Sequence, residues 1–238
     1  MAAPSQFKLP GETRSPIILR VGFWACVLIG AGAVVLRLIA LSNPTGRPQQ
    51  MASLDTIFAS HTVLTLSHIV PAILFVLISP FAVFARFAHL QWPLRMLFPT
   101  AAIVGLTAYA MNVYAIGGWT ERIVILIFNT WFLYALVRAF RHWRRADAAL
   151  TRRWLLRAIA AVLGVATARP VMGVFFATSP LTHLEPRQFF GIAMAVGFSV
   201  NVIVFEVWLR SLARRAHSSQ TSTAPVLTVT APISGGTR

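Results

Sequence analysis

Six long apolar stretches constrain what this chain can fold into. They cover residues 17–41, 63–87, 96–116, 123–140, 155–178 and 189–209. Each approaches the ~20 residues that a helix needs to cross the hydrocarbon core of a bilayer. The stretches lack the alternation of barrel strands, and lipid offers no hydrogen-bond partner to exposed backbone groups. The sequence therefore predicts an all-α, polytopic integral membrane protein with six transmembrane helices.

The composition excludes a water-soluble enzyme. Hydrophobic residues make up 57% of the chain and charged residues only 11%, whereas charged residues make up about 25% of an ordinary soluble domain. The chain has no phosphate-binding glycine loop, no zinc-ligand spacing and no nucleophile elbow. Cys26 is the only cysteine, which excludes a multi-thiolate metal site. We predict no metal and no catalytic residue, and a non-enzymatic protein is favoured.

Three regions follow from this pattern. Residues 1–16 form a predicted N-terminal tail, residues 17–210 the transmembrane domain, and residues 211–238 a tail rich in Ser, Thr and Gly that we expect to be disordered. The first stretch is longer than the core of about 7–15 residues that signal peptides carry. It is therefore interpreted as an uncleaved membrane anchor.

The distribution of charge predicts the orientation. The chain has 21 Lys and Arg against 6 Asp and Glu, a formal net charge of +15. If the N-terminal tail is cytoplasmic, nearly all of this excess falls on the cytoplasmic side, while Glu121 and Arg122 fall outside. This asymmetry is the positive-inside signature. It predicts both termini in the cytoplasm of a bacterium, a location in the cytoplasmic (inner) membrane, and the lipid bilayer rather than nucleic acid as the partner of the arginines.

Three ionisable residues in the spans are candidates for ligand binding. Arg169 lies nine residues before Thr178, about 13 Å from that end of the span at ~1.5 Å per residue, and Pro170 follows it. His61 and His68 are two helical turns apart and so share one face, with His68 at a depth similar to that of Arg169. Ionisable groups at such depth are functional candidates by default. The alternative is structural: an arginine bonded to neighbouring groups, and neutral histidines that form interhelical hydrogen bonds.

Four further polar residues are predicted to be structural. Glu206 lies near the cytoplasmic end of the last span, where it should pair with Arg157 or Arg210 more readily than with Arg169. Glu206 is the only carboxylate assigned to a span. Proton-coupled transporters usually have several buried carboxylates, so this scarcity argues against such a transporter. The remaining three are amides expected to form interhelical hydrogen bonds, namely Asn112, Asn129 and Asn201.

Haem b is the cofactor alternative, although no cofactor is predicted. Bis-histidine ligation needs imidazoles from opposite sides of the porphyrin, normally from two helices. His61 and His68 share one helix, and the other histidines lie in predicted loops, at interfaces or in the tail. His183 could approach His61 at the outer surface.

From the second span onward the chain resembles a bacterial multi-pass family catalogued as domain of unknown function 2306. The resemblance covers about residues 60–210 and implies an integral inner-membrane protein without an established activity. This chain lacks two histidines that the family often has. The first belongs to a histidine-arginine pair after the second span, where this chain reads Trp92-Pro93-Leu94-Arg95-Met96; the second directly precedes Arg-Arg-Trp, where this chain has Thr151. The matching features are His68, Ser79-Pro80-Phe81, Arg86, the Gly117-Gly118 turn, Arg152-Arg153-Trp154-Leu155-Leu156-Arg157, Arg169, and the segment from Asn201 through Glu206 to Arg210.

Three functional hypotheses remain open from the sequence. The first is a membrane-embedded binding or transport-accessory protein whose polar interior, centred on Arg169 and His68, takes a small anionic or lipidic ligand. The second is a haem-linked or redox membrane subunit. The third is a non-catalytic component that docks a membrane or cytoplasmic protein partner through the basic region of residues 138–157.

Overall fold

The described part of the chain is all-helical. The structure, a computed structural model, describes residues 17–42, 60–84, 91–183 and 185–222. Within these residues there are six long helices and no strand, and all six are long and apolar enough to cross a membrane. This confirms the predicted fold class at the level of helix content. The helices are α1 (Ile17–Ser42), α3 (Thr62–Val83), α4 (Trp92–Asn112), α5 (Gly118–Arg144), α6 (Ala148–Thr182) and α7 (Pro186–Ser222).

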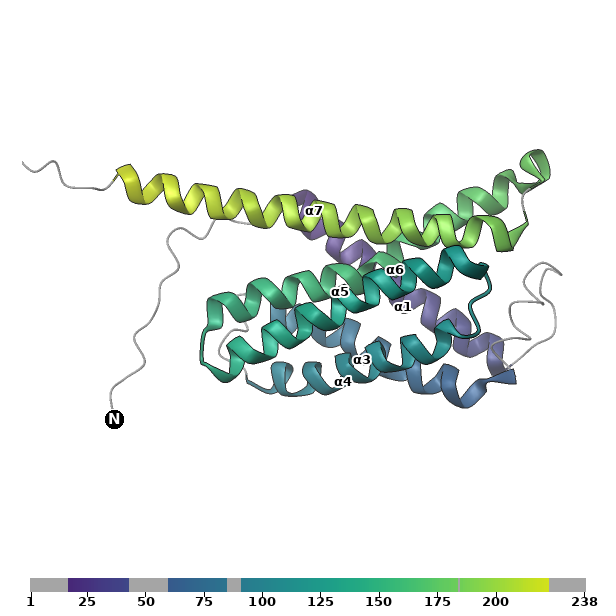
Figure 1. Cartoon of the computed structure of the whole chain (residues 1–238), viewed down its shortest axis with the longest axis horizontal. Coiled ribbons are helices and arrows are strands. Elements are labelled where there is room, and N and C mark those ends of the chain that lie inside the picture. Colours follow the sequence, from purple (N-terminus) through teal and green to yellow (C-terminus); the bar gives the residue numbers. More distant parts are fainter. Residues whose placement is uncertain (1–16, 43–59, 85–90, 184, 223–238) are drawn as a thin grey trace, which may run out of the picture.

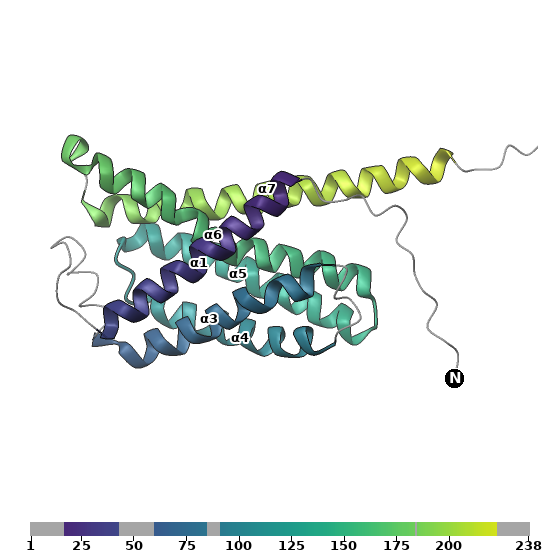
Figure 2. The same ribbon diagram turned by 180° about the vertical axis from the view of Figure 1, so that it is seen from behind.

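The helices alternate in direction, so that successive connections lie at opposite ends of the bundle (Figure 1). One end carries the turn between α5 and α6 at residues 145–147; we call it the basic end. The other, the far end, carries the α4–α5 and α6–α7 connections. Seen from behind, α1 crosses the other helices diagonally (Figure 2). α6 packs against α7, α5, α1 and α3, which makes it the central helix of the fold.

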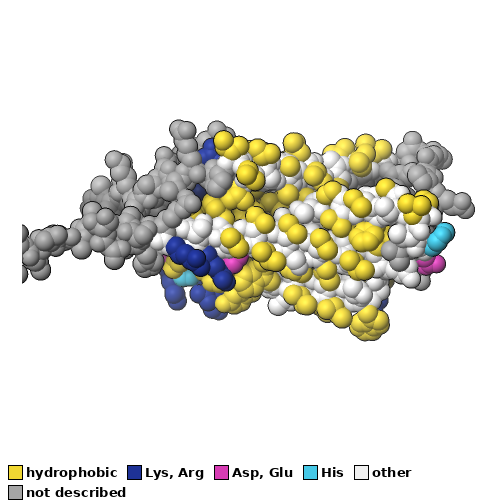
Figure 3. All heavy atoms as spheres, turned by 90° about the horizontal axis from the view of Figure 1, so that it is seen from above, with side chains coloured by type: hydrophobic (Ala, Val, Ile, Leu, Met, Phe, Trp, Pro, Cys, Tyr) yellow, Lys and Arg dark blue, Asp and Glu magenta, His cyan; other side chains and the backbone are white. Residues whose placement is uncertain are grey.

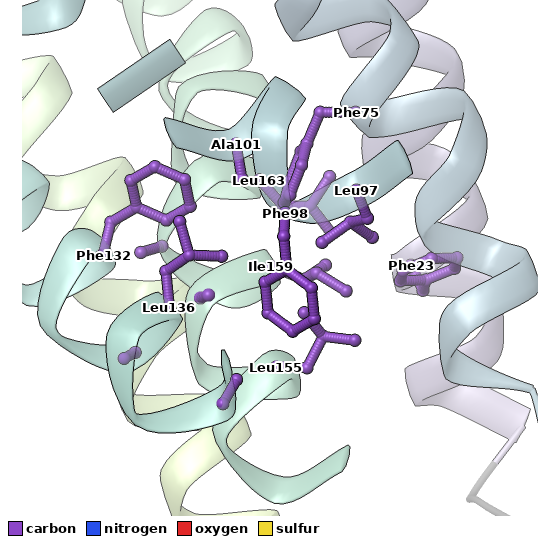
Figure 4. Close-up of a cluster of buried hydrophobic side chains, with 14 of the residues drawn as sticks. Phe23, Phe75, Leu97, Phe98, Ala101, Phe132, Leu136, Leu155, Ile159 and Leu163 are labelled. Carbon is purple, nitrogen blue, oxygen red and sulfur yellow. The ribbon is translucent and has the colours of Figure 1, made fainter. Parts of the chain in front are cut away.

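Large apolar side chains from five helices meet around the first half of α6. Leu155, Ile159 and Leu163 of α6 are 1%, 0% and 2% exposed. They lie within one cluster with Phe75 of α3 and Phe132 of α5 (Figure 4). Phe23 and Leu97 bring α1 and α4 to the same cluster. In lipid, such contacts stabilise the bundle through close packing, because the tails around it are equally apolar.

Glycines let α6 and α7 approach closely. A Cβ atom added at Gly197 would lie 2.5 Å from the backbone nitrogen of Ala168, and one at Gly164 would lie 2.7 Å from Cα of Phe198. Neither position has space for a side chain. These small residues therefore mark a helix-packing interface between α6 and α7.

The later helices α5, α6 and α7 extend further than the apolar stretches do. α5 continues to Arg144 and α6 begins at Ala148, so most of the basic segment expected between the two spans is helical. Asp147 caps α6, because its side chain accepts a hydrogen bond from the backbone nitrogen of Leu150 at 3.0 Å. α7 continues to Ser222, so the tail predicted to begin at residue 211 begins inside a helix. Residues 1–16, 85–90 and 223–238 lie outside the described residues.

Candidate functional site

Basic side chains gather at one end of the bundle. Figure 3 shows Lys and Arg concentrated at the basic end and His with Asp or Glu at the far end. The last turn of α5 contributes Arg141 and Arg144, and α6 continues the group with Arg152 and Arg153 in its first turns. The separation of charge that the sequence predicts is thus present in the folded chain.

Glu206 of α7 joins two arginines. Its Oε2 accepts a hydrogen bond from Nε of Arg157 at 2.9 Å, and its Oε1 accepts one from Nη2 of the same residue at 3.2 Å. Oε1 also accepts a bond from Nε of Arg210 at 3.0 Å. The predicted pairing with Arg157 and Arg210 is confirmed. The two-point contact with Arg157 fixes the relative position of α6 and α7.

The amides connect neighbouring helices. Nδ2 of Asn129 in α5 donates to the carbonyl of Gly105 in α4 at 2.9 Å. Nδ2 of Asn112 donates to the carbonyl of Arg122 at 3.3 Å. Asn201 instead accepts a bond from Oγ1 of Thr167 at 3.0 Å, while its buried Nδ2 has no hydrogen-bond partner within the described residues. The prediction that these amides donate hydrogen bonds between helices is confirmed for Asn112 and Asn129, whereas Asn201 accepts one.

His68 of α3 and His61, which directly precedes α3, both contact the α4 side. Nδ1 of His68 lies 2.9 Å from Oγ1 of Thr107 in α4. The ring of His61 lies 3.8 Å, centroid to centroid, from that of Tyr114, which follows α4. Only His68 lies within the helix, but both rings face the segment that α4 begins. For His68 the interhelical hydrogen bond is the structural alternative of the sequence analysis.

Arg169 lies apart from this contact. Its side chain is exposed, as are those of Val165 one turn before it and of Pro170. Its neighbours Ala166 and Ala168 are buried. His68 is bonded to Thr107 and not to Arg169. Arg169 thus lies at an exposed position of α6, and the polar interior centred on Arg169 and His68 stays a prediction.

Sequence reasoning missed the burial of a second carboxylate in the helices. Glu121 was assigned to the outer side, but it lies in the first turn of α5, inside the span Gly118–Arg144, and is only 6% exposed. Its Oε2 accepts a hydrogen bond from the backbone nitrogen of Gly117 at 2.6 Å. Glu206 is therefore not the only carboxylate in the six helices that are long and apolar enough to cross a membrane. The signal in the sequence was an acidic residue in the first turn after Gly117, where the helix dipole favours it.

Glu121 belongs to a polar group at the far end. Nη2 of Arg122 donates to the carbonyl of Val113 at 2.8 Å, and its guanidinium lies 5.4 Å from the ring centroid of Trp119. Nε of Arg122 and Oδ1 of Asn112 are buried without a hydrogen-bond partner in the described residues. The bonds that are present close the connection between α4 and α5.

The histidines near α3 face a helix without histidine. His61 and His68 both contact the α4 side, and α4 itself contains no histidine to oppose them. Within the described residues, no group of three or more His, Cys, Asp and Glu side chains is placed to hold a metal ion.

Comparison with known proteins gives no relative. No family model matches the chain, and neither the curated proteins nor the solved structures contain a match. The resemblance to domain of unknown function 2306 therefore stays a prediction.

Proposed function

We propose that this chain is a multi-pass protein of the bacterial cytoplasmic membrane that binds a small anionic or lipidic ligand at Arg169. It acts as a binding or transport-accessory protein rather than as an enzyme. Six apolar helices support the membrane location. The gathering of arginines at the basic end supports an orientation with that end in the cytoplasm.

The exposed side chain of Arg169 carries the proposal. Counting from Thr182, the last residue of α6, Arg169 is thirteen residues into the helix, about 20 Å along its axis. A guanidinium stays charged at any physiological pH and offers a planar set of donors to carboxylates and phosphates. At this depth an anionic group brought by an amphiphile would form charge-assisted hydrogen bonds with it.

The surroundings of Arg169 suit an apolar chain attached to that anionic group. Val165 and Val174 are exposed, at 36% and 64%. A Cβ atom added at Gly173, one turn beyond Arg169, would meet nothing within 4 Å. Pro170 lacks a backbone N–H and so leaves the carbonyl of Ala166 without its helical donor. An amphiphile with one anionic group fits this combination of one charge and apolar surface.

Binding of oleate and of its uncharged methyl ester tests the proposal. The purified protein in neutral nanodiscs should bind oleate about tenfold more tightly than methyl oleate, a difference of ~1.4 kcal/mol. Arg169→Gln should remove this preference and Arg169→Lys should keep part of it. Arg153→Gln, which removes an exposed arginine from the basic end of the same helix, is the matched control and should bind as wild type does.

Two outcomes would contradict the proposal. One is an Arg169→Gln protein that inserts normally and still prefers oleate. The other is a Soret band in the absorption spectrum of protein expressed with haem available, which would favour the haem-linked alternative.

A further inference from the structure

A second group of arginines surrounds one indole near the basic end. The guanidinium carbons of Arg138 in α5 and Arg157 in α6 each lie 4.7 Å from the ring centroid of Trp154. Nη1 of Arg138 also donates to the hydroxyl of Tyr134 at 3.1 Å. We call Arg138, Tyr134, Trp154 and Arg157 the arginine–tryptophan cluster. Contacts of this kind hold a cation in place without neutralising it.

The two arginines of the cluster differ in how their charge is balanced. Arg157 has its two-point contact with Glu206, which Arg210 shares. Arg138 has no carboxylate within ion-pair distance among the described residues, and its only hydrogen bond there uses one donor nitrogen. A guanidinium has five N–H donors. Arg138 is therefore a fixed, uncompensated positive charge with donors to spare.

The position of the cluster matches the membrane interface. Arg138 lies six residues before Arg144, the end of α5, and Trp154 six residues after Ala148, the start of α6. Both are then about 9 Å from the basic end at ~1.5 Å per residue. Trp and Tyr are enriched at this level in membrane proteins, where lipid headgroups and the first carbons of the acyl chains lie.

An exposed strip of α5 leads away from Arg138 toward the far end. The strip consists of three side chains that precede Arg138 in the sequence: Tyr134, Ile127 and Ile123, which are 46%, 59% and 52% exposed. Their spacing of four or seven residues keeps them on the same side of the helix as Arg138. Thr130, between them, turns its hydroxyl to Tyr109 of α4 at 2.7 Å and to the carbonyl of Leu126 at 2.6 Å. The strip is thus apolar toward the lipid.

We propose that the arginine–tryptophan cluster binds the phosphate group of an anionic phospholipid, with Arg138 as its direct donor and an acyl chain along the exposed strip of α5. Glu206 acts as a positioning residue, because it holds Arg157 beside the indole. This site is separate from Arg169: its direct donor Arg138 is on α5, and its α6 residues, Trp154 and Arg157, lie twelve or more residues before Arg169. Its ligand is a lipid of the surrounding membrane.

Lipid-dependent unfolding tests this site. Protein in a neutral detergent is titrated with dioleoylphosphatidylglycerol, with dioleoylphosphatidylcholine, or with inorganic phosphate, and the thermal midpoint is followed. The wild-type midpoint should rise with the anionic lipid at concentrations where the zwitterionic lipid and inorganic phosphate have little effect. Arg138→Gln should raise the concentration of anionic lipid needed for half the effect about tenfold, because a charge-assisted contact is lost.

Matched variants separate the site from general charge. Arg95→Gln removes one exposed arginine from the first turns of α4 and should respond to the lipids as wild type does. Arg138→Lys keeps the charge without the planar fork of donors and should give an intermediate response. This variant also keeps the test informative if Arg138→Gln fails to fold.

Three results would overturn the proposal. The first is an equal response of Arg138→Gln and wild type to the anionic lipid. The second is an equal loss of response in Arg95→Gln, which would indicate a diffuse attraction between the basic end and the membrane. The third is stabilisation by inorganic phosphate that matches that by the anionic lipid, which would indicate a site for a free anion.

Discussion

At the scale of single residues, several polar side chains within the apolar helices are bonded to a neighbouring helix. His68 contacts Thr107, Asn129 contacts the carbonyl of Gly105, and Thr167 contacts Asn201. An unpaired polar group is costly in hydrocarbon, so these bonds favour one arrangement of the helices over others. Arg169 is exposed, whereas the side chains of Asn129 and Asn201 are buried. Its exposure makes it accessible to the ligand that we propose.

The contact between His68 and Thr107 is predicted to affect stability and not ligand binding. Thr107→Val keeps the shape of the side chain and removes the hydroxyl that lies 2.9 Å from Nδ1 of His68. The free energy of unfolding in mixed micelles should fall by about 0.5–1.5 kcal/mol, the range of interhelical hydrogen bonds in membrane proteins. The preference for oleate should be unchanged. A lost preference with unchanged stability would place His68 in the ligand site.

The bridge between Arg157 and Glu206 is predicted to couple α6 and α7. The two side chains are 16% and 26% exposed, so removal of one partner should cost about 1–2 kcal/mol, more than at a fully exposed pair. A double-mutant cycle with Arg157→Ala and Glu206→Ala, read by unfolding in mixed micelles, measures the coupling. Arg214→Ala, at an exposed position of α7, is the control. Strict additivity of the two substitutions would show that the bridge contributes nothing.

At the scale of helices, the close contact of α6 with α7 positions two polar side chains of α6, Arg157 and Thr167. Gly164 and Gly197 allow the backbones to approach. The contact brings Thr167 to Asn201 and Arg157 to Glu206. With Ala168 packed on Gly197, the neighbouring position of Arg169 is directed to the surface, because consecutive residues of a helix point about 100° apart. The exposure of Arg169 is thus a consequence of where the small residues lie.

Substitution of Gly197 is predicted to separate the two helices. The added Cβ of Gly197→Ala would lie 2.5 Å from the backbone nitrogen of Ala168, an atom that cannot move independently of its helix. Unfolding in mixed micelles should show a loss of about 1–3 kcal/mol, as for other overpacked sites. Gly173→Ala adds the same methyl group on α6 where nothing lies within 4 Å and should be neutral or slightly stabilising. Equal effects of the two substitutions would contradict this account of the interface.

The presence of the helices was predictable from hydropathy, but their ends were not. An apolar run indicates which part of a helix is suited to lipid. The helix itself continues wherever caps and helix propensity allow, so α5 ends only at Arg144 and α6 already begins at Ala148. The partners of Glu206 were predictable because residues near one end of neighbouring spans lie at similar depth. The direction of Arg169 was not, because depth gives no information about which side of a helix meets its neighbours. The burial of Glu121 likewise depends on packing at the far end. A Cβ atom added at Gly191 would lie 2.8 Å from the backbone nitrogen of Glu121.

At the scale of the whole molecule, the alternating helices place the arginines of α5 and α6 together at one end (Figure 3). The far end carries His183 and Glu185 in its α6–α7 connection. In a bacterial membrane, this asymmetry should retain the basic end in the cytoplasm. The proposed sites at Arg138 and Arg169 both depend on this placement, since it decides which leaflet each can contact.

Cysteine labelling in intact cells tests this placement most directly. In a Cys26→Ser background, Ala149→Cys marks the basic end and Leu181→Cys, at a position 83% exposed, marks the far end. A membrane-impermeant maleimide should label Leu181→Cys in intact cells and Ala149→Cys only after the cytoplasmic membrane is permeabilised. Labelling of Ala149→Cys in intact cells, with Leu181→Cys protected, would contradict the proposed orientation.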